Sequence, residues 1–123
     1  MSGIKSEQLE PLVIDALEEL KGVDILSLDV AEASGFTDHM VIVTGTSRRH
    51  VKSLADNLLR RCRDVGVRPL GVEGEEVADW VLVDLGDAVV HIMSPETRDF
   101  YNLEKLWDLG RHGAASGPAG STP

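Results

Sequence analysis

Residues 73–93 read EGEEVADWVLVDLGDAVVHIM, two runs rich in apolar residues on either side of a Gly-Asp dipeptide. Glycine at the first central position of a two-residue loop is the preference of the type II′ turn, so the stretch predicts a β-hairpin. The turn also fixes the register, which we predict to pair Val83 with Val90 and Trp80 with Met93. The fold is therefore built outward from this hairpin.

The predicted register sorts the hairpin side chains onto two faces, because successive residues of a strand point to opposite sides. One face is wholly apolar and is expected to be core: Val81, Val83, Leu85, Ala88, Val90 and Ile92. The other face mixes large apolar and titratable groups: Trp80, Leu82, Asp84, Val89, His91 and Met93. Trp and Met are enriched where proteins meet other proteins, which favours an interaction surface. A second core layer covered by helices is the alternative.

The rest of the chain supplies helices and strands that complete an α/β domain. Apolar residues at helical spacing predict helices over residues 9–20 and 51–62, and Ser94 followed by Pro95 starts a third over residues 94–107. Apolar runs predict strands over residues 24–32, 40–45 and 68–74, and the second of these is expected to be central. The order α-β-β-α-β-β-β-α predicts a single α/β domain with a mixed sheet of about five strands.

Length and composition limit the class of protein. The chain has 123 residues, and we place one domain over residues 1–109 and a disordered Gly, Ala, Ser and Pro tail over residues 110–123. The lone cysteine, Cys62, lies on an apolar helical stripe and is expected to be a core residue in a reducing compartment. Without a signal peptide or a membrane-length apolar run, the expectation is a cytoplasmic protein with no membrane partner.

The charge distribution points to a basic protein partner. The net charge is -9 and the basic residues are dispersed, so little direct nucleic-acid binding is expected. Six carboxylates and no Lys or Arg lie within residues 73–87, which suits approach to a basic protein. A solvated acidic rim that only keeps the protein soluble is the alternative.

The acidic residues of the hairpin do not have the spacing of a catalytic metal site. A Mg²⁺-dependent transferase commonly needs two carboxylates one residue apart on a strand face, but Leu82 and Gly86 flank Asp84 in this way. We therefore predict no enzyme activity, no metal and no cofactor. The alternative is a nucleotide-binding or nucleotidyl-transfer enzyme that uses Asp84 and a helix start at Thr46 and Ser47, where Arg48 would assist an anion.

Three segments carry a resemblance to a known family. They are TDHMVIVTGTSRRHVKSLAD at 37–56, GVEGEEVADWVLVDLGDAVVHIM at 71–93 and RDFYNLEKLW at 98–107. Together they resemble the Iojap-related ribosomal silencing factors (RsfS) of bacteria and organelles, and the similarity spans residues 6–107. Asp99 and Lys105 stand where Glu and Arg are usual in that family, which is a conservative departure.

The resemblance implies a translational repressor rather than an enzyme. Such a factor binds the large ribosomal subunit through ribosomal protein fourteen and sterically blocks joining of the small subunit, silencing ribosomes under nutrient limitation. The resemblance also implies a fold related to nucleotidyltransferases but degenerate as an enzyme, and a homodimer when the protein is free.

The matching segments suggest which residues bind the partner. Trp80 and Leu82 are the expected apolar anchors, with Met93 beside them, and Tyr101 and Leu103 are weaker candidates. The residues expected to complement a basic protein are the carboxylates Glu73, Glu76, Asp79 and Asp84. Phe100, at helical spacing with Leu103 and Trp107, is expected instead to dock the last helix on the sheet.

Overall fold

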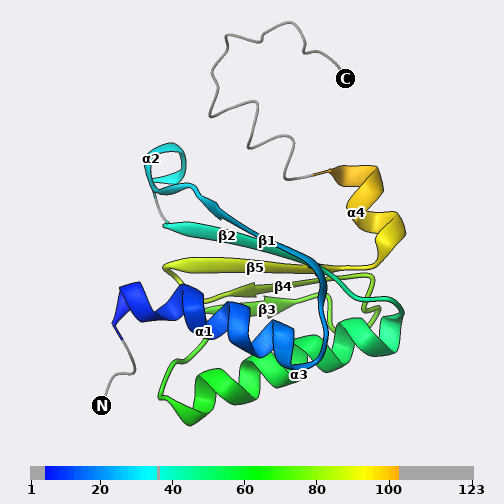
Figure 1. Cartoon of the computed structure of the whole chain (residues 1–123), viewed down its shortest axis with the longest axis horizontal. Helices are drawn as coiled ribbons and strands as arrows, with labels where there is room; N and C mark the ends of the chain where they lie inside the picture. The colour runs from blue at the N-terminus through cyan, green and yellow to red at the C-terminus, as the bar shows by residue number, and fades with distance from the viewer. Residues whose placement is uncertain (1–4, 36, 103–123) are drawn as a thin grey trace, which may run out of the picture.

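The computed structural model describes residues 5–35 and 37–102, and every structural statement concerns this part of the chain. A five-stranded sheet has the strand order β1-β2-β5-β4-β3 (Figure 1), in which β2 and β5 are parallel and the other neighbours antiparallel. The strands are β1 (Val23–Asp29), β2 (His39–Thr44), β3 (Gly71–Glu73), β4 (Trp80–Asp84) and β5 (Ala88–Met93). The helices are α1 (Ser6–Glu19), α2 (Ala31–Ser34), α3 (Arg48–Asp64) and α4 (Pro95–Tyr101).

The element order confirms the predicted α/β class with two differences. The single turn of α2 was not predicted, and the last helix ends at Tyr101, while residues 103–107 of its predicted range lie outside the described residues. Asn102 takes a left-handed conformation, with φ of 50°, and its N–H donates to the carbonyl of Arg98, which ends the helix. The strand predicted to be central, β2, is interior and almost fully buried, but the middle position of the sheet belongs to β5. The expected tail over residues 110–123 lies outside the described residues.

The hairpin of β4 and β5 has the register predicted from its turn. Val83 pairs with Val90 and Trp80 with Met93. Gly86 has φ of 87°, a conformation that glycine adopts without a steric penalty, and the Leu85 N–H donates to the Ala88 carbonyl at 2.8 Å. The apolar face of the hairpin is therefore buried as expected.

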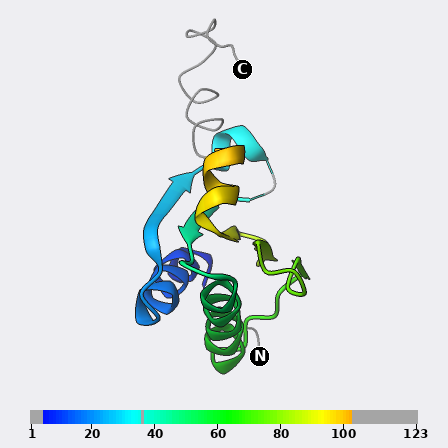
Figure 2. The ribbon, with the colours of Figure 1, turned by 90° about the vertical axis from the view of Figure 1, so that its right-hand side faces the viewer.

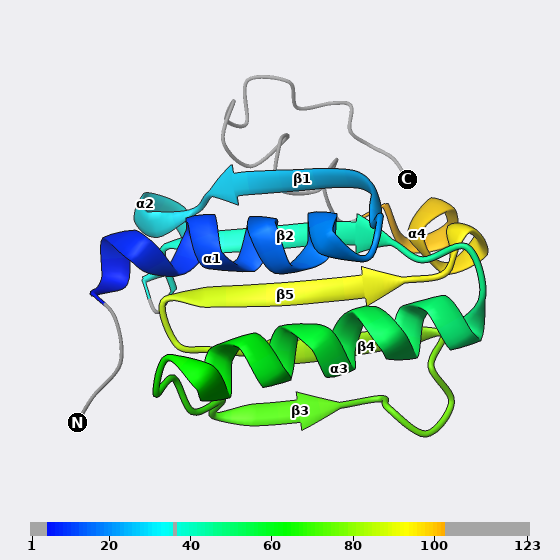
Figure 3. The ribbon, with the colours of Figure 1, turned by 60° about the horizontal axis from the view of Figure 1, so that its bottom comes forward.

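Helices α1 and α3 lie side by side on one face of the sheet (Figures 2 and 3). Their apolar stripes meet the apolar face of the strands in one main core, which also buries Cys62 completely and raises the pKa of its thiol to about 11. This confirms the core role predicted for Cys62. The fully buried side chains of this core are Val13, Ala16, Leu17, Val41, Val43, Val51, Leu54, Ala55, Leu58, Cys62, Val81, Val83, Val90 and Ile92. No helix in the described part of the chain has the length and apolar character needed to cross a membrane.

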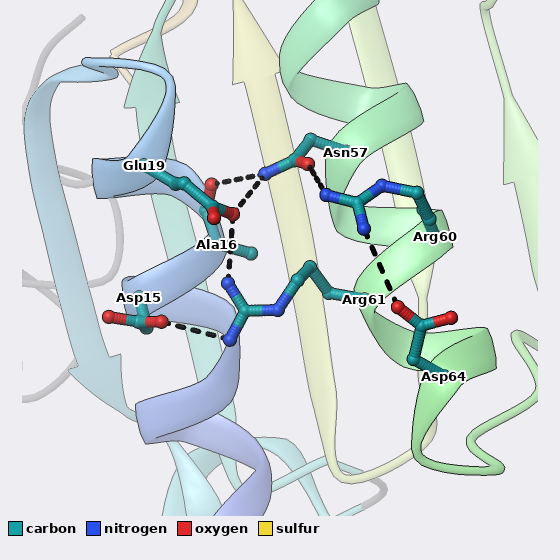
Figure 4. Close-up of polar contacts among 7 residues, drawn as sticks. All are labelled: Asp15, Ala16, Glu19, Asn57, Arg60, Arg61 and Asp64. Carbon is teal, nitrogen blue, oxygen red and sulfur yellow. Dashed lines mark hydrogen bonds and ion pairs between the residues drawn. The ribbon is translucent and has the colours of Figure 1, made fainter.

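A polar network joins α1 to α3 beside the core (Figure 4). Asn57, on α3, is buried and donates from Nδ2 to the Ala16 carbonyl at 3.0 Å and to Glu19 Oε1 at 2.9 Å. Arg61 bridges Asp15 and Glu19 with two contacts of 2.9 Å, and the hydrogen bonds from Asn57 and Arg61 lower the pKa of Glu19. Two carboxylates one helical turn apart are thus held together instead of repelling.

We expect Asn57→Ala to lower the free energy of unfolding by about 2 kcal/mol, because the buried Ala16 carbonyl loses its side-chain donor. Urea unfolding followed by circular dichroism measures the change. Asn57→Asp has the same size but replaces the donor with an acceptor, so it should destabilise at least as much. Equal stability of wild type and both variants would show that the network does not contribute.

Candidate functional site

The candidate site lies on the face of the sheet opposite α1 and α3, which we call the second face. In the described residues no helix crosses the middle of this face, and α4 lies at one end of it (Figures 1 and 2). The strand register places Trp80 beside Met93, and Leu82 between Glu73 and His91. The mixed set of side chains predicted from the hairpin therefore does share one face of the sheet.

His91 fixes the orientation of Trp80. The indole N–H of half-buried Trp80 donates to His91 Nδ1 at 3.0 Å, so this imidazole is uncharged and carries its proton on Nε2. His91 is only 6% exposed, and this burial lowers its pKa to about 4. The hydrogen bond from Trp80 offsets part of the desolvation cost of burying the His91 imidazole, and it leaves the second face without a positive charge there.

Two aromatic residues from α4 extend the surface around Trp80. The Tyr101 ring lies 4.8 Å from the Trp80 ring, centroid to centroid, and Phe100 meets Tyr101 edge-on at 4.9 Å. We call Trp80, Phe100 and Tyr101 the aromatic cluster. Phe100 is 79% exposed and Tyr101 52% exposed, so the prediction that Phe100 docks the last helix on the sheet is wrong. Phe100 and Tyr101 are the last two residues of α4 and are exposed beside Trp80, which the helical spacing of Phe100, Leu103 and Trp107 did not predict.

The other predicted apolar anchors differ in accessibility. Leu82 is half-buried and reaches the surface between Glu73 and His91. Met93 is completely buried, so its predicted role as an exposed anchor is wrong. It pairs with Trp80 in the register. Leu103 lies outside the described residues.

The four predicted carboxylates fall into two groups. Glu73 and Glu76 are exposed, and neither has a hydrogen-bond or ion-pair partner within the described ranges. Asp79 pairs with Arg48 at 2.9 Å, and Asp84 Oδ1 accepts from the Gly86 N–H at 2.9 Å, which stabilises the hairpin turn. Glu73 and Glu76 are therefore the two whose charge is available to a partner.

The residues of the alternative enzyme site do not come together. Asp84 pairs with Val89 at one end of β4, whereas Thr46 follows Thr44 beyond the Trp80 end of the sheet. Four strand residues, about 13 Å, separate the two ends. Among the described residues no group of three or more His, Cys, Asp and Glu side chains has metal-binding geometry.

The helix start at Thr46 and Ser47 is occupied by internal contacts. Ser47 Oγ accepts from the His50 N–H at 3.1 Å as the N-cap of α3. The Thr46 N–H donates to His50 Nδ1 at 2.9 Å, so Nε2 carries the proton and donates to the Leu20 carbonyl at 2.8 Å. The adjoining cavity, of about 420 Å³, is lined by Arg48, Asp79 and Glu96. Asp79 pairs with Arg48, and the charge that remains is the carboxylate of Glu96, which opposes an anion.

We expect the protein to lose about 3 kcal/mol of stability as the pH falls from 7 to 4 because of His91. The unfolded chain takes up this proton near pH 6.5 and the folded chain only near pH 4, so protonation favours unfolding throughout that window. Urea unfolding at several pH values measures the loss. His91→Gln keeps an uncharged acceptor for Trp80 and should show a shallower pH dependence; parallel profiles for the two proteins would refute the assignment.

Comparison with known proteins identifies the family. The model of the family "RsfS: Ribosomal silencing factor during starvation" matches residues 4–119. The ribosomal silencing factor RsfS of Haemophilus influenzae is 48% identical over 99 residues, which cover 80% of this chain and 97% of that protein. A mouse protein, mitochondrial assembly of ribosomal large subunit protein 1, is 36% identical over 101 residues, which cover 80% of this chain and 44% of that protein.

A solved structure agrees with this similarity. A crystal structure of a Chromobacterium violaceum protein superposes with a TM-score of 0.83 at 38% sequence identity, covering 98% of this chain and 91% of that one. Sequence, family model and fold thus agree over nearly the whole domain. The chain belongs to the RsfS family, the ribosomal silencing factors during starvation.

Proposed function

We propose that the protein silences translation by binding the large ribosomal subunit and sterically blocking the joining of the small subunit. Its contact on the large subunit is ribosomal protein fourteen, and it acts in the cytoplasm as a binding protein without catalysis. The name of the family supports a silencing role, and the name of the mouse relative supports the large subunit as partner. The observation that carries the proposal is the second face, with its aromatic cluster beside unpaired carboxylates.

The aromatic cluster has the properties of a docking anchor. Trp80 is half-buried, and its indole donates a hydrogen bond to His91 and contacts the Tyr101 ring. A side chain that is already ordered loses less conformational entropy on binding, so more of the gain from burying the indole appears as affinity. Tryptophan and tyrosine are also the residues that most often dominate binding energy in protein interfaces.

The charges beside the cluster favour a basic partner. Glu73 lies directly opposite Leu82 in the register, and Glu76 follows in the loop that leads to β4. Their unpaired carboxylates give the second face a negative edge that attracts a basic ribosomal protein from a distance. A stable homodimer of the free protein, implied by the family resemblance, belongs to the same proposal; sedimentation equilibrium of the ribosome-free protein tests it.

Trp80→Ala is expected to weaken binding to the large subunit by about 2 kcal/mol, or roughly 30-fold, because the indole is the largest anchor of the second face. Co-sedimentation with purified large subunits in a sucrose gradient measures the loss. Leu20→Ala removes an apolar side chain that is 37% exposed at the end of α1, on the other side of the sheet, and is the matched control.

The same gradients, run with both subunits, test the block of subunit joining. Wild type is expected to lower the yield of joined ribosomes, and Trp80→Ala to lower it less at equal concentration. Circular dichroism confirms that each variant is folded. A folded Trp80→Ala protein that binds large subunits as tightly as wild type would exclude the second face as the docking surface.

Glu73→Gln with Glu76→Gln is expected to slow association with the large subunit several-fold and to change dissociation little, since exposed charges act mainly on encounter. Stopped-flow fluorescence at two salt concentrations separates the two rates. The wild-type association rate should fall steeply with added salt, and the rate of the double variant less so. An unchanged association rate at low salt would contradict the predicted role of these carboxylates.

A further inference from the structure

A cavity on the helix side of the sheet is lined by basic residues, whereas the second face carries unpaired carboxylates. It has a volume of about 440 Å³ and lies between the end of α3, the loop after it and β3; we call it the flank cavity. Its apolar lining comes from Leu59, Val67, Pro69 and Val72, and its basic lining from Arg63 and Arg68. None of the residues that line it is acidic.

The end of α3 builds this cavity through a Schellman motif. Gly66 has φ of 80°, the Val67 N–H donates to the Cys62 carbonyl at 2.8 Å, and the Gly66 N–H donates to the Arg63 carbonyl at 3.1 Å. This hydrogen-bond pair reverses the chain across the helix end. Val67 and the residues after it therefore form one wall of the cavity and α3 the other.

The apolar residues at the base of the cavity belong to the partly exposed edge of the main core. Leu59 and Val72 are half-buried and pack against the buried cluster. β3 has three residues and pairs only with β4 among the described strands, so its other edge carries no strand there. An exposed strand edge beside an apolar pocket is the arrangement to which extended peptides add as a further strand.

Arg63, near the end of α3, and Arg68, in the loop after it, differ from Arg48, Arg60 and Arg61 of that helix. Arg49, at the helix start, also has no partner among the described residues, but it does not line the flank cavity. Arg48 and Arg61 pair with carboxylates at 2.9 Å, and Arg60 lies 3.5 Å from Asp64. The guanidinium groups of Arg63 and Arg68 are exposed and have no partner within the part of the chain that the structure describes. By contrast, three other cavities are each bordered by at least one carboxylate. In a chain of net charge -9, the flank cavity is thus a local site for negative charge.

We propose that the flank cavity binds a short acidic peptide segment of a partner protein. An apolar side chain of the peptide fills the pocket over Leu59 and Val72, carboxylates beside it pair with Arg63 and Arg68, and the peptide backbone runs along the free edge of β3. The apolar lining favours a peptide over a nucleic-acid backbone, which has no apolar side chain to bury there. The inference goes beyond the proposed function, because this site lies across the sheet from the second face and selects the opposite charge.

The test uses the full chain and peptides selected from a random library. Phage-displayed random octapeptides are selected on the wild-type protein, and the enriched peptides are synthesised with a fluorophore for anisotropy titration. Enriched sequences are expected to carry two or more acidic residues around an apolar one. Arg63→Glu with Arg68→Glu is expected to weaken their binding at least about tenfold, because two attractive charges become repulsive.

Two controls separate this site from the second face and from loss of folding. Arg63→Lys with Arg68→Lys keeps both charges and should bind within about threefold of wild type. Trp80→Ala should leave peptide binding unchanged while weakening large-subunit binding, so the two proposals fail independently. Urea unfolding checks that the double Glu variant is folded.

Three outcomes would overturn the proposal. They are enriched peptides without acidic residues, equal binding of acidic peptides to wild type and the double Glu variant, and displacement of the peptides by a single-stranded RNA oligonucleotide that itself binds with higher affinity. The last outcome would assign the arginines to a nucleic-acid contact.

Discussion

The pairing of β4 with β5 is the constraint on which the rest of the structure depends. A slip of one residue in this hairpin would exchange its two faces, burying Asp84 and His91 against α1 and α3 and exposing the valines. The turn at Gly86 prevents this slip, because only glycine adopts that backbone conformation without strain. The hairpin register set at Gly86 therefore determines both which side chains enter the main core and which lie on the second face.

The sheet separates two kinds of chemistry within a small domain. The second face combines a preorganised tryptophan with unpaired carboxylates, whereas the opposite side combines helices, ion pairs and the flank cavity. Arg48 and Arg61 of α3, which face the loop before β4 and α1, are each paired with a nearby acid, whereas Arg63 near the helix end is not. Contacts on one side of the sheet can thus be altered by mutation with little effect on the other.

The sequence was informative where structure depends on neighbouring residues. The hairpin register, the Ser94 and Pro95 helix start and the core position of Cys62 were all predicted, because turn chemistry, capping and helical spacing are local. The exposure of Phe100 and the burial of Met93 were not, since both depend on where α4 ends and how it packs on the sheet. Likewise, only the strand order shows that Thr46 and Asp84 lie at opposite ends. The flank cavity also escaped prediction, because Arg63 and Arg68 look unremarkable until the helix end brings them around one pocket.

The parallel contact between β2 and β5 has a consequence for folding kinetics. Val41 pairs with Val90, so the chain must close a loop of almost fifty residues before this contact forms, whereas the hairpin closes locally. Ile42 of the distant strand likewise pairs with His91. The hairpin can therefore form early, whereas the surface around Trp80 also needs the contacts of β5 with β2 and of Trp80 with Tyr101. A partly folded chain would carry the binding residues without yet displaying them as one surface.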